Sequence, residues 1–276
     1  MTSASTRVLN TRPRIAITSA GEGEPVVLLH GLGSVKENWQ SQLQALSKTR
    51  FVVAWDARGY GASDDYDGEL DFAADFSTDL LGVLDDLGIA RAHLVGLSMG
   101  GMIAQCFYFL HPQRVATLTL ADTFHSFAAL GHQAVEGFRA ARLRPLLEGK
   151  EPADLAAAAA DAMLAPGAPR EARDTLVASL AGLRKASYVK TVEALLRQPP
   201  VGRLEDIEVP TLVLTGELDR LAPVAVAQDM VRKIPNAELH VVVGSGHLSN
   251  LECPADFNAA VGRFLEAQSM SLRNGG

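Results

Sequence analysis

The chain has 276 residues, of which 47% are hydrophobic and 21% are charged, and its formal net charge at pH 7 is -7. This length and composition are ordinary for a globular protein and suffice for one large domain with an insertion. The negative charge argues against a nucleic-acid partner, and because lysine and arginine form no run, we expect no attraction to an anionic membrane surface.

The first half of the chain alternates between strand-like and helix-like segments. Residues 2–14 lack the apolar core of a secretion signal and are interpreted as a frayed end plus a first strand, and residues 14–18 alternate as an edge strand does. Beyond a turn at residues 21–24, short apolar runs predict buried strands and amphipathic or apolar runs of helical length predict helices. The predicted strands are residues 25–29, 51–55, 93–95 and 115–120, and the predicted helices are residues 37–46, 72–87 and 102–110.

The alternation stops at about residue 124, and helix-like segments then follow one another without strands up to about residue 204. These segments are residues 134–147, 152–165, 170–183 and 188–197. Strands and helices then alternate again, before a tail at residues 269–276 for which we expect disorder. The later elements are strands at residues 211–215 and 238–243 and helices at residues 224–233 and 255–267.

The pattern as a whole predicts an α/β protein. Because the strands are apolar throughout, we expect a mostly parallel sheet that is covered by helices on both faces. We predict that residues 1–123 and 205–276 form this core and that residues 124–204 are inserted into it as a helical cap.

Ser98 lies in the sequence Gly96-Leu97-Ser98-Met99-Gly100, between a predicted strand and a predicted buried helix. A sharp turn at this junction would hold the serine in a strained backbone conformation and expose its hydroxyl at the helix N-terminus. The two glycines remove Cβ atoms that would collide as the strand and the helix fold together. Ordinary turns also use glycine and serine, so the motif needs support from the rest of the chain.

That support comes from two later strand ends. Asp219 follows the strand at residues 211–215, and His247 follows the strand at residues 238–243. The carboxyl ends of parallel strands lie at one edge of a sheet, so the loops there can bring Ser98, Asp219 and His247 together. Such a set supplies a nucleophile, an acid that orients the histidine, and a general base.

Each member of this set has an alternative. Asp219 could simply cap the helix at residues 224–233, and Asp122, which follows the strand at residues 115–120, is a rival for the orienting acid. Among the other histidines, His30 is expected to be structural. His125 and His132 stand at the entrance to the predicted cap, where we expect surface exposure more than substrate contact.

The order of strand, serine, acid and histidine resembles the α/β-hydrolase family over nearly the whole chain, residues 14–267. Within that family, residues 91–101 and 247–252 closely resemble the corresponding stretches of bacterial 3-oxoadipate enol-lactonases and related carboxylesterases, and residues 56–63 are similar too. The resemblance implies the α/β-hydrolase fold and a serine hydrolase that cleaves a small carboxylic ester or lactone through an acyl-enzyme.

The expected reaction forms an oxyanion that needs hydrogen-bond donors. We expect the backbone N–H of Met99, in the serine turn, and that of Leu32, in the loop His30-Gly31-Leu32-Gly33, to form the oxyanion hole. Gly31, Phe124 and Leu248 are the residues expected to line the substrate pocket.

Two other functions stay open. Hydrolases that cleave a carbon–carbon bond in ring-fission diketones resemble the chain overall, although their Gly-Gly-Gly-Pro-Gly oxyanion segment is absent here. Some proteins of this fold keep the triad and act as small-molecule receptors with little turnover. Enol-lactonases also hold an anionic substrate, for which Arg139, Arg142 and Arg144 could supply positive charge, although arginines on a solvated helix face are common.

No metal or cofactor is expected, because the chain has no H-E-x-x-H or C-x-x-C spacing and no glycine-rich phosphate loop at a strand end. Cys106 and Cys253 are too few for a disulfide framework, so we expect reduced thiols and a cytoplasmic location. No run of eighteen apolar residues is present, so no membrane-spanning helix is expected. The expected partner is therefore a small ester or lactone, with neither a nucleic acid nor a membrane.

Overall fold

The computed structural model of the protein describes residues 4–127 and 131–274. Within them the strands form one eight-stranded sheet in the order β1-β2-β4-β3-β5-β6-β7-β8. β2 pairs antiparallel with β1 and with β4, and the pairs from β4 through β8 are parallel. The strands are β1 (Ser5–Val8), β2 (Ala16–Ala20), β3 (Pro25–Leu29), β4 (Phe51–Trp55), β5 (Ala92–Leu97), β6 (Val115–Ala121), β7 (Thr211–Gly216) and β8 (Ala237–Val242).

Helices cover both faces of the sheet, as predicted. Alternate residues of β3 show this: Val27 and Leu29 belong to a core that contains side chains of α2, α3 and α8, whereas Val26 and Leu28 belong to a second core that contains side chains of α1 and α10. Strands buried on both faces need apolar residues at every position, which explains their uninterrupted apolar runs. The helices are α1 (Gln40–Leu46), α2 (Phe72–Asp86), α3 (Met99–Leu110), α8 (Val224–Lys233), α9 (Ser249–Glu252) and α10 (Pro254–Asn274).

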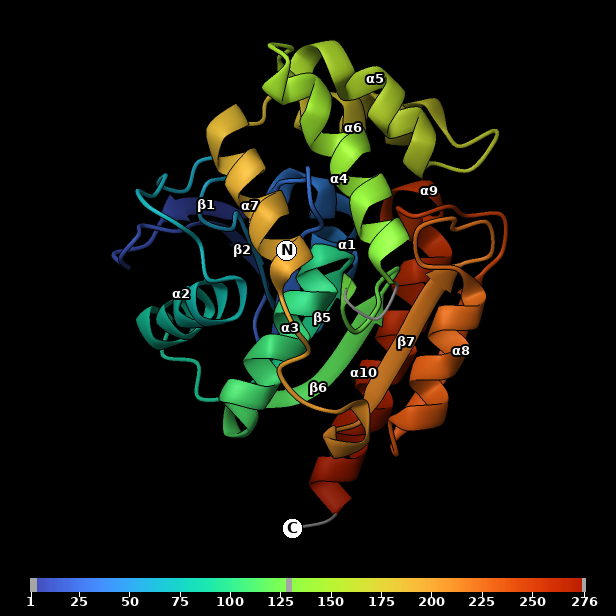
Figure 1. The fold of residues 1–276 in the computed structure, drawn as a ribbon. Coiled ribbons are helices and arrows are strands. Elements are labelled where there is room, and N and C mark those ends of the chain that lie inside the picture. Colours follow the sequence, from blue (N-terminus) through green and yellow to red (C-terminus); the bar gives the residue numbers. More distant parts are fainter. Residues whose placement is uncertain (1–3, 128–130, 275–276) are drawn as a thin grey trace.

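Four helices between β6 and β7 lie beyond the carboxyl end of β7, where the arrow of this strand points in Figure 1. We call them the four-helix insertion. α4 packs against α7, and α5 packs against α6. They are α4 (His132–Leu147), α5 (Pro152–Met163), α6 (Arg170–Ala181) and α7 (Lys185–Arg197). The exact division of the chain into core and cap at residues 124 and 204 stays a prediction.

Two predictions at the ends of the chain are wrong. Residues 14–18 do not form an edge strand, because β1 pairs with the outer side of β2; the four residues of β1 are all exposed, so they carry no apolar signal of a strand. The tail is helical through Asn274 as a continuation of α10, and the Ser269 hydroxyl donates to Glu24 and to the Leu265 carbonyl. Residues 2 and 3 of the expected frayed end and residues 275–276 of the tail lie outside the described residues.

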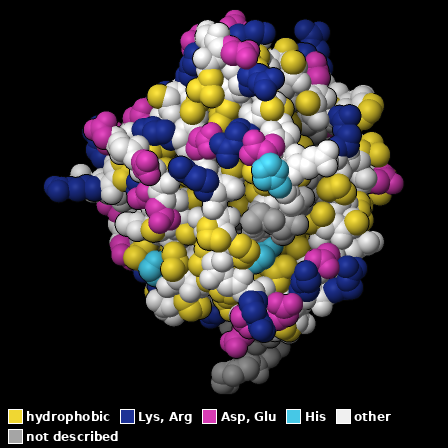
Figure 2. Space-filling model, viewed as in Figure 1, with side chains coloured by type: hydrophobic (Ala, Val, Ile, Leu, Met, Phe, Trp, Pro, Cys, Tyr) yellow, Lys and Arg dark blue, Asp and Glu magenta, His cyan; other side chains and the backbone are white. Residues whose placement is uncertain are grey.

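The length and apolar character of the helices bear on whether any of them could span a membrane. In the described part of the chain, none of them has both the length and the apolar character that crossing a membrane requires. On the face shown in Figure 2, basic and acidic side chains are intermixed. Cys106 is buried and Cys253 half-buried, and both are free thiols.

Candidate active site

Ser98 occupies the single residue between the end of β5 and the start of α3. Its backbone has φ 54° and ψ -116°, which is a strained conformation for a residue with a side chain. The flanking glycines make the turn possible, because a Cβ on Gly96 would lie 2.3 Å from the carbonyl oxygen of Gly100 and a Cβ on Gly100 would lie 2.0 Å from that of Leu29. The sharp turn predicted from the motif is therefore present.

The space around Gly100 predicts a large effect of one methyl group. We expect Gly100→Ala to lower the free energy of unfolding by about 3 kcal/mol, because its Cβ meets the backbone of β3, a central strand that cannot move away. The matched control is Gly262→Ala in α10, where no heavy atom outside the adjoining backbone of the same helix lies within 4 Å of the added Cβ; we expect it to raise the free energy of unfolding by about 0.5–1 kcal/mol. Urea unfolding followed by circular dichroism compares them, and equal stability of the two variants would contradict the steric argument.

His247 links the serine to an acid. Its Nε2 lies 2.9 Å from Ser98 Oγ, and its Nδ1 lies 2.8 Å from Asp219 Oδ2. The other carboxylate oxygen of Asp219 accepts hydrogen bonds from the N–H groups of Leu221 and Ala222 at 2.8 and 3.0 Å. Asp219 does not cap α8, whose N-cap is Pro223. The three loops converge as the parallel sheet predicts, and the carboxylate is held in one orientation.

The charges of Asp219 and His247 stabilise each other inside the protein. Burial alone would raise the pKa of Asp219, but the charge and hydrogen bond of His247 outweigh it, and this pKa lies below its ordinary value. Burial alone would lower the pKa of His247, but the attraction and hydrogen bond of Asp219 outweigh it, and this pKa lies above its ordinary value. A protonated imidazole formed during a reaction would therefore be stabilised here.

Asp122 lies close enough to this pair to affect the pKa of His247, but its hydrogen bonds in the described structure go to Gly216 and Ser249. Its Oδ1 accepts from the N–H of Gly216 at 2.9 Å, and its Oδ2 accepts from both the N–H and the hydroxyl of Ser249. Burial, followed by the charge of Asp219, raises the pKa of Asp122 to about 7. Asp122 thus ties the end of β7 to the loop that carries His247, and the geometry gives the orienting position to Asp219.

The loop after β3 comes close to the serine. A Cβ on Gly31 would lie 3.3 Å from Ser98 Cβ and 3.1 Å from Leu97 Cδ2, so a side chain at residue 31 would crowd the site. The loop is braced by His30, whose Nδ1 lies 2.9 Å from the Gly31 carbonyl and whose Nε2 accepts from the N–H of Ala57 at 3.0 Å. Burial lowers the pKa of His30, so the ring is neutral and the structural role expected for it fits.

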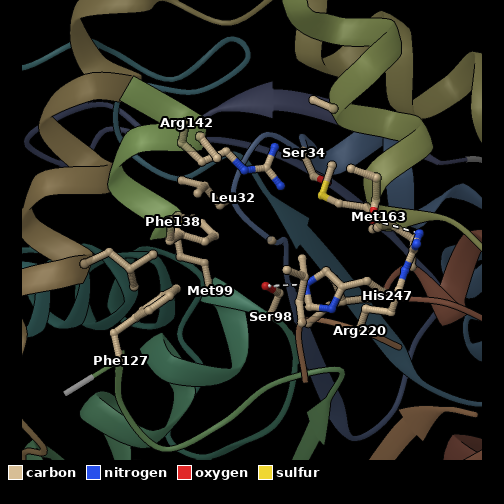
Figure 3. Close-up of a pocket in the computed structure, with 18 of the residues that line it drawn as sticks. Leu32, Ser34, Ser98, Met99, Phe127, Phe138, Arg142, Met163, Arg220 and His247 are labelled. Atoms are coloured by element: carbon tan, nitrogen blue, oxygen red, sulfur yellow. Dashed lines mark hydrogen bonds between the residues drawn. The ribbon is translucent and has the colours of Figure 1, made fainter. Parts of the chain in front are cut away.

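Ser98 and His247 open into a cavity of about 550 Å³ between the sheet edge and the four-helix insertion (Figure 3). All three residues expected in the pocket line it, namely Gly31, Phe124 and Leu248, and so do the two residues expected to supply the oxyanion hole, Leu32 and Met99. The walls are mostly apolar and include aromatic and aliphatic side chains of α4 and α5, among them Phe138, Leu155 and Met163. Such a cavity suits a small, largely apolar ligand.

The sequence did not predict which cationic side chains line the cavity. Arg142 from α4 and Arg220 from the loop after β7 both do so.

The expectation of surface exposure holds for His132 but is wrong for His125. His125 is half-buried, with Nδ1 3.0 Å from Gln105 Oε1 and Nε2 2.9 Å from the Gly202 carbonyl. Among the residues that the structure describes, no group of three or more His, Cys, Asp or Glu side chains could hold a metal ion.

Comparisons with known proteins agree on the fold. The sequence pattern of the alpha/beta hydrolase fold family matches residues 24–254. The chain is 33% identical to a 2-hydroxy-6-oxononadienedioate/2-hydroxy-6-oxononatrienedioate hydrolase of Burkholderia vietnamiensis, over 92% of each protein. It is 30% identical to 3-oxoadipate enol-lactonase 2 of Acinetobacter baylyi, over 86% of each. The solved structure of an enol-lactonase from Burkholderia xenovorans matches 95% of this chain and 100% of its own, with a TM-score of 0.83 and 27% identity.

Proposed function

The chain belongs to the α/β-hydrolase family, and we propose that within it the protein is a serine hydrolase that cleaves a small carboxylic ester or lactone without a metal or cofactor. The observation that carries this proposal is the hydrogen-bonded series from Ser98 through His247 to Asp219, which opens on the apolar cavity. The similarity to enol-lactonases in sequence and in structure supports the substrate class.

In the first half of the reaction, Ser98 Oγ attacks the substrate carbonyl carbon and gives its proton to His247 Nε2. The imidazolium then has two N–H groups, and the Nδ1–H donates to Asp219, whose negative charge stabilises it. Collapse of the tetrahedral intermediate breaks the bond to the alcohol oxygen, which takes the proton from His247. In a lactone this oxygen stays attached to the acyl chain, so ring opening gives an acyl-enzyme without loss of a fragment.

The oxyanion of the intermediate needs donors that are already in place. The first N–H groups of a helix have no acceptor within the helix, and Met99 is the first residue of α3, so its N–H can serve the oxyanion. The N–H of Leu32 is the second donor, because Gly31 brings that loop against Ser98. In comparable sites, loss of one such donor raises the barrier by about 2.7–4 kcal/mol.

In the second half, His247 takes a proton from water, and the resulting hydroxide attacks the acyl carbonyl. Ser98 leaves with the proton from His247, and the carboxylic acid is released.

We further propose that residues 124–204 are a cap domain over a core of residues 1–123 and 205–276 and that the enzyme works in the cytoplasm. The cavity walls from α4 and α5 support a cap that admits small molecules and excludes bulky polymers.

A comparison of substrates tests the reaction. We expect kcat/KM with a short-chain aryl ester or an enol-lactone to exceed that with a vinylogous diketo acid, and we expect EDTA to have no effect. A preference of about a hundredfold for the diketo acid corresponds to about 2.7 kcal/mol of transition-state binding and would overturn the ranking. Loss of all activity in EDTA would overturn the metal-free mechanism.

Hydrolysis of a carbon–carbon bond in a ring-fission diketone is the second candidate. It is favoured by the 33% identity to the Burkholderia vietnamiensis hydrolase over 92% of each protein. The loop His30-Gly31-Leu32-Gly33 favours the ester or lactone. A receptor with little turnover is the remaining alternative, and it predicts stoichiometric binding with only slow release of nitrophenol from aryl esters.

A further inference from the structure

Arg142 places a positive charge inside a cavity whose walls are otherwise largely apolar. It is half-buried on α4, and Figure 3 shows its guanidinium extending into the space near Ser34, above Ser98 and His247. No aspartate or glutamate is found among the described residues that line this cavity. The other arginine of the cavity, Arg220, is exposed, and its Nη2 donates to the carbonyl oxygens of Ala162 and Leu164.

The contacts of Arg142 hold the guanidinium without neutralising it. Its Cζ lies 5.4 Å from the centre of the Phe138 ring, and its side chain interacts with the phenol oxygen of Tyr188. No carboxylate in the described part of the chain forms an ion pair with it. By contrast, Arg139, one turn earlier on the same helix, is paired with Glu136 and with Glu193 of α7. The charge of Arg142 is thus available to a ligand.

The charge of Arg142 also acts electrostatically on His247. The positive charge of Arg142 acts to lower the pKa of His247, although burial and Asp219 have larger effects on that pKa. Arg142 and the candidate triad therefore face the same space. A half-buried guanidinium without an acidic partner is costly to desolvate, and its planar set of N–H donors matches a carboxylate with two parallel hydrogen bonds.

We propose that Arg142 binds a free carboxylate of the substrate, so that the substrate is an ester or lactone that carries a second, ionised carboxyl group on a short apolar chain. The proposal rests on the proposed function, because it concerns a ligand whose other end lies at Ser98. Phe138 and the aliphatic walls of the cavity contact the chain between the two ends. Arg142 is then the residue that selects anionic substrates over neutral ones.

Two matched esters test this proposal. One is the mono-para-nitrophenyl ester of adipic acid, which has a free carboxylate, and the other is its methyl ester, which is neutral. We expect wild-type protein to prefer the anionic ester by at least about tenfold in kcat/KM. Arg142→Met should abolish that preference, mainly by raising KM for the anionic ester, and Arg142→Lys should restore part of it because it keeps the charge without the planar donors. Arg144→Met, at an exposed position of the same helix, is the control and should keep the wild-type preference.

A second readout does not depend on turnover. The Ser98→Ala variant should bind adipate in a calorimetric titration, and the added Arg142→Met change should weaken that binding by at least about tenfold. An equal loss for both esters in Arg142→Met would mean that Arg142 serves a step common to all substrates, such as the oxyanion, and would overturn the carboxylate site. Failure to hydrolyse either ester would overturn the proposed function instead, and adipate binding that ignores residue 142 would overturn the inference alone.

Discussion

Replacement of Ser98 by alanine is expected to lower kcat for aryl ester hydrolysis by about five to six orders of magnitude. Among the described residues, the Ser98 hydroxyl is the group that is hydrogen-bonded to His247 Nε2. The alanine variant keeps the donors of the oxyanion hole but has no atom that can form the acyl-enzyme. In comparable triads, loss of the serine costs about as much as loss of the whole triad. The measurement is steady-state turnover of para-nitrophenyl acetate with protein purified free of contaminating esterases.

A covalent label provides the control for this variant. A fluorophosphonate should add once to the wild-type protein, at Ser98, and should not add to Ser98→Ala. Ser34→Ala, which removes another serine hydroxyl from the same cavity, should still be labelled at Ser98. If the label adds elsewhere while Ser98→Ala stays active, then another residue is the nucleophile and the mechanism is wrong.

The central strands could be predicted from the sequence because nearly all of their residues are buried. β3 and β4 begin and end at the predicted residues, since their apolar runs are bounded by turn residues or by loops rich in glycine. A first strand is expected within residues 2–14, but the bounds of β1 and its pairing with the outer side of β2 could not be predicted in this way, because its side chains are exposed. The extension of α10 through Asn274 was also missed, since its last turns do not show the apolar pattern of a helix that packs on a sheet.

The convergence of Ser98, Asp219 and His247 could be predicted from topology alone, because each follows a strand of a parallel sheet. Which of the two acids orients the histidine could not be predicted from the topology. Asp122 and Asp219 follow β6 and β7, which are neighbours in the sheet, so both carboxylates come near the histidine. Only the hydrogen-bond geometry separates Asp219, on His247 Nδ1, from Asp122, on Ser249 and Gly216.

The position of Arg142 shows a second limit of sequence analysis. Three arginines lie within six residues of α4, and the sequence alone does not show which of them faces the cavity. Once α4 is packed, its cavity face is formed by residues three or four apart, namely Ala134, Gly137, Phe138, Ala141 and Arg142. Arg139 then pairs with Glu193, and Arg144 is exposed. The angle at which α4 lies on the other helices decides this, and it depends on contacts that are distant in the sequence.

The orienting acid can be identified by comparing Asp219→Asn with Asp122→Asn. We expect Asp219→Asn to lower kcat by about four orders of magnitude, because an amide N–H beside His247 Nδ1 favours the tautomer with hydrogen on Nε2, which cannot accept the Ser98 proton. Asp122→Asn should lower kcat only slightly, because Asp219 still holds the imidazole ring of His247. A thousandfold loss of kcat in Asp122→Asn, with little loss of kcat in Asp219→Asn, would show that Asp122 is the acid that orients His247.

The pH profile gives an independent measure of the same assignment. His247 must be neutral to act as a base, so kcat/KM falls as the pH decreases through the pKa of this residue. Asp219 holds that pKa above its ordinary value against the opposing effect of burial. The residual activity of Asp219→Asn should therefore extend to lower pH than that of the wild type, because the attraction is lost and burial remains. Asp122→Asn should keep its acid limb much closer to that of the wild type, since the charge of Asp122 is a smaller cause of the raised pKa. Rates measured from about pH 5 to about pH 9 separate the two variants, and an acid limb that does not move in Asp219→Asn would show that this carboxylate does not stabilise the imidazolium.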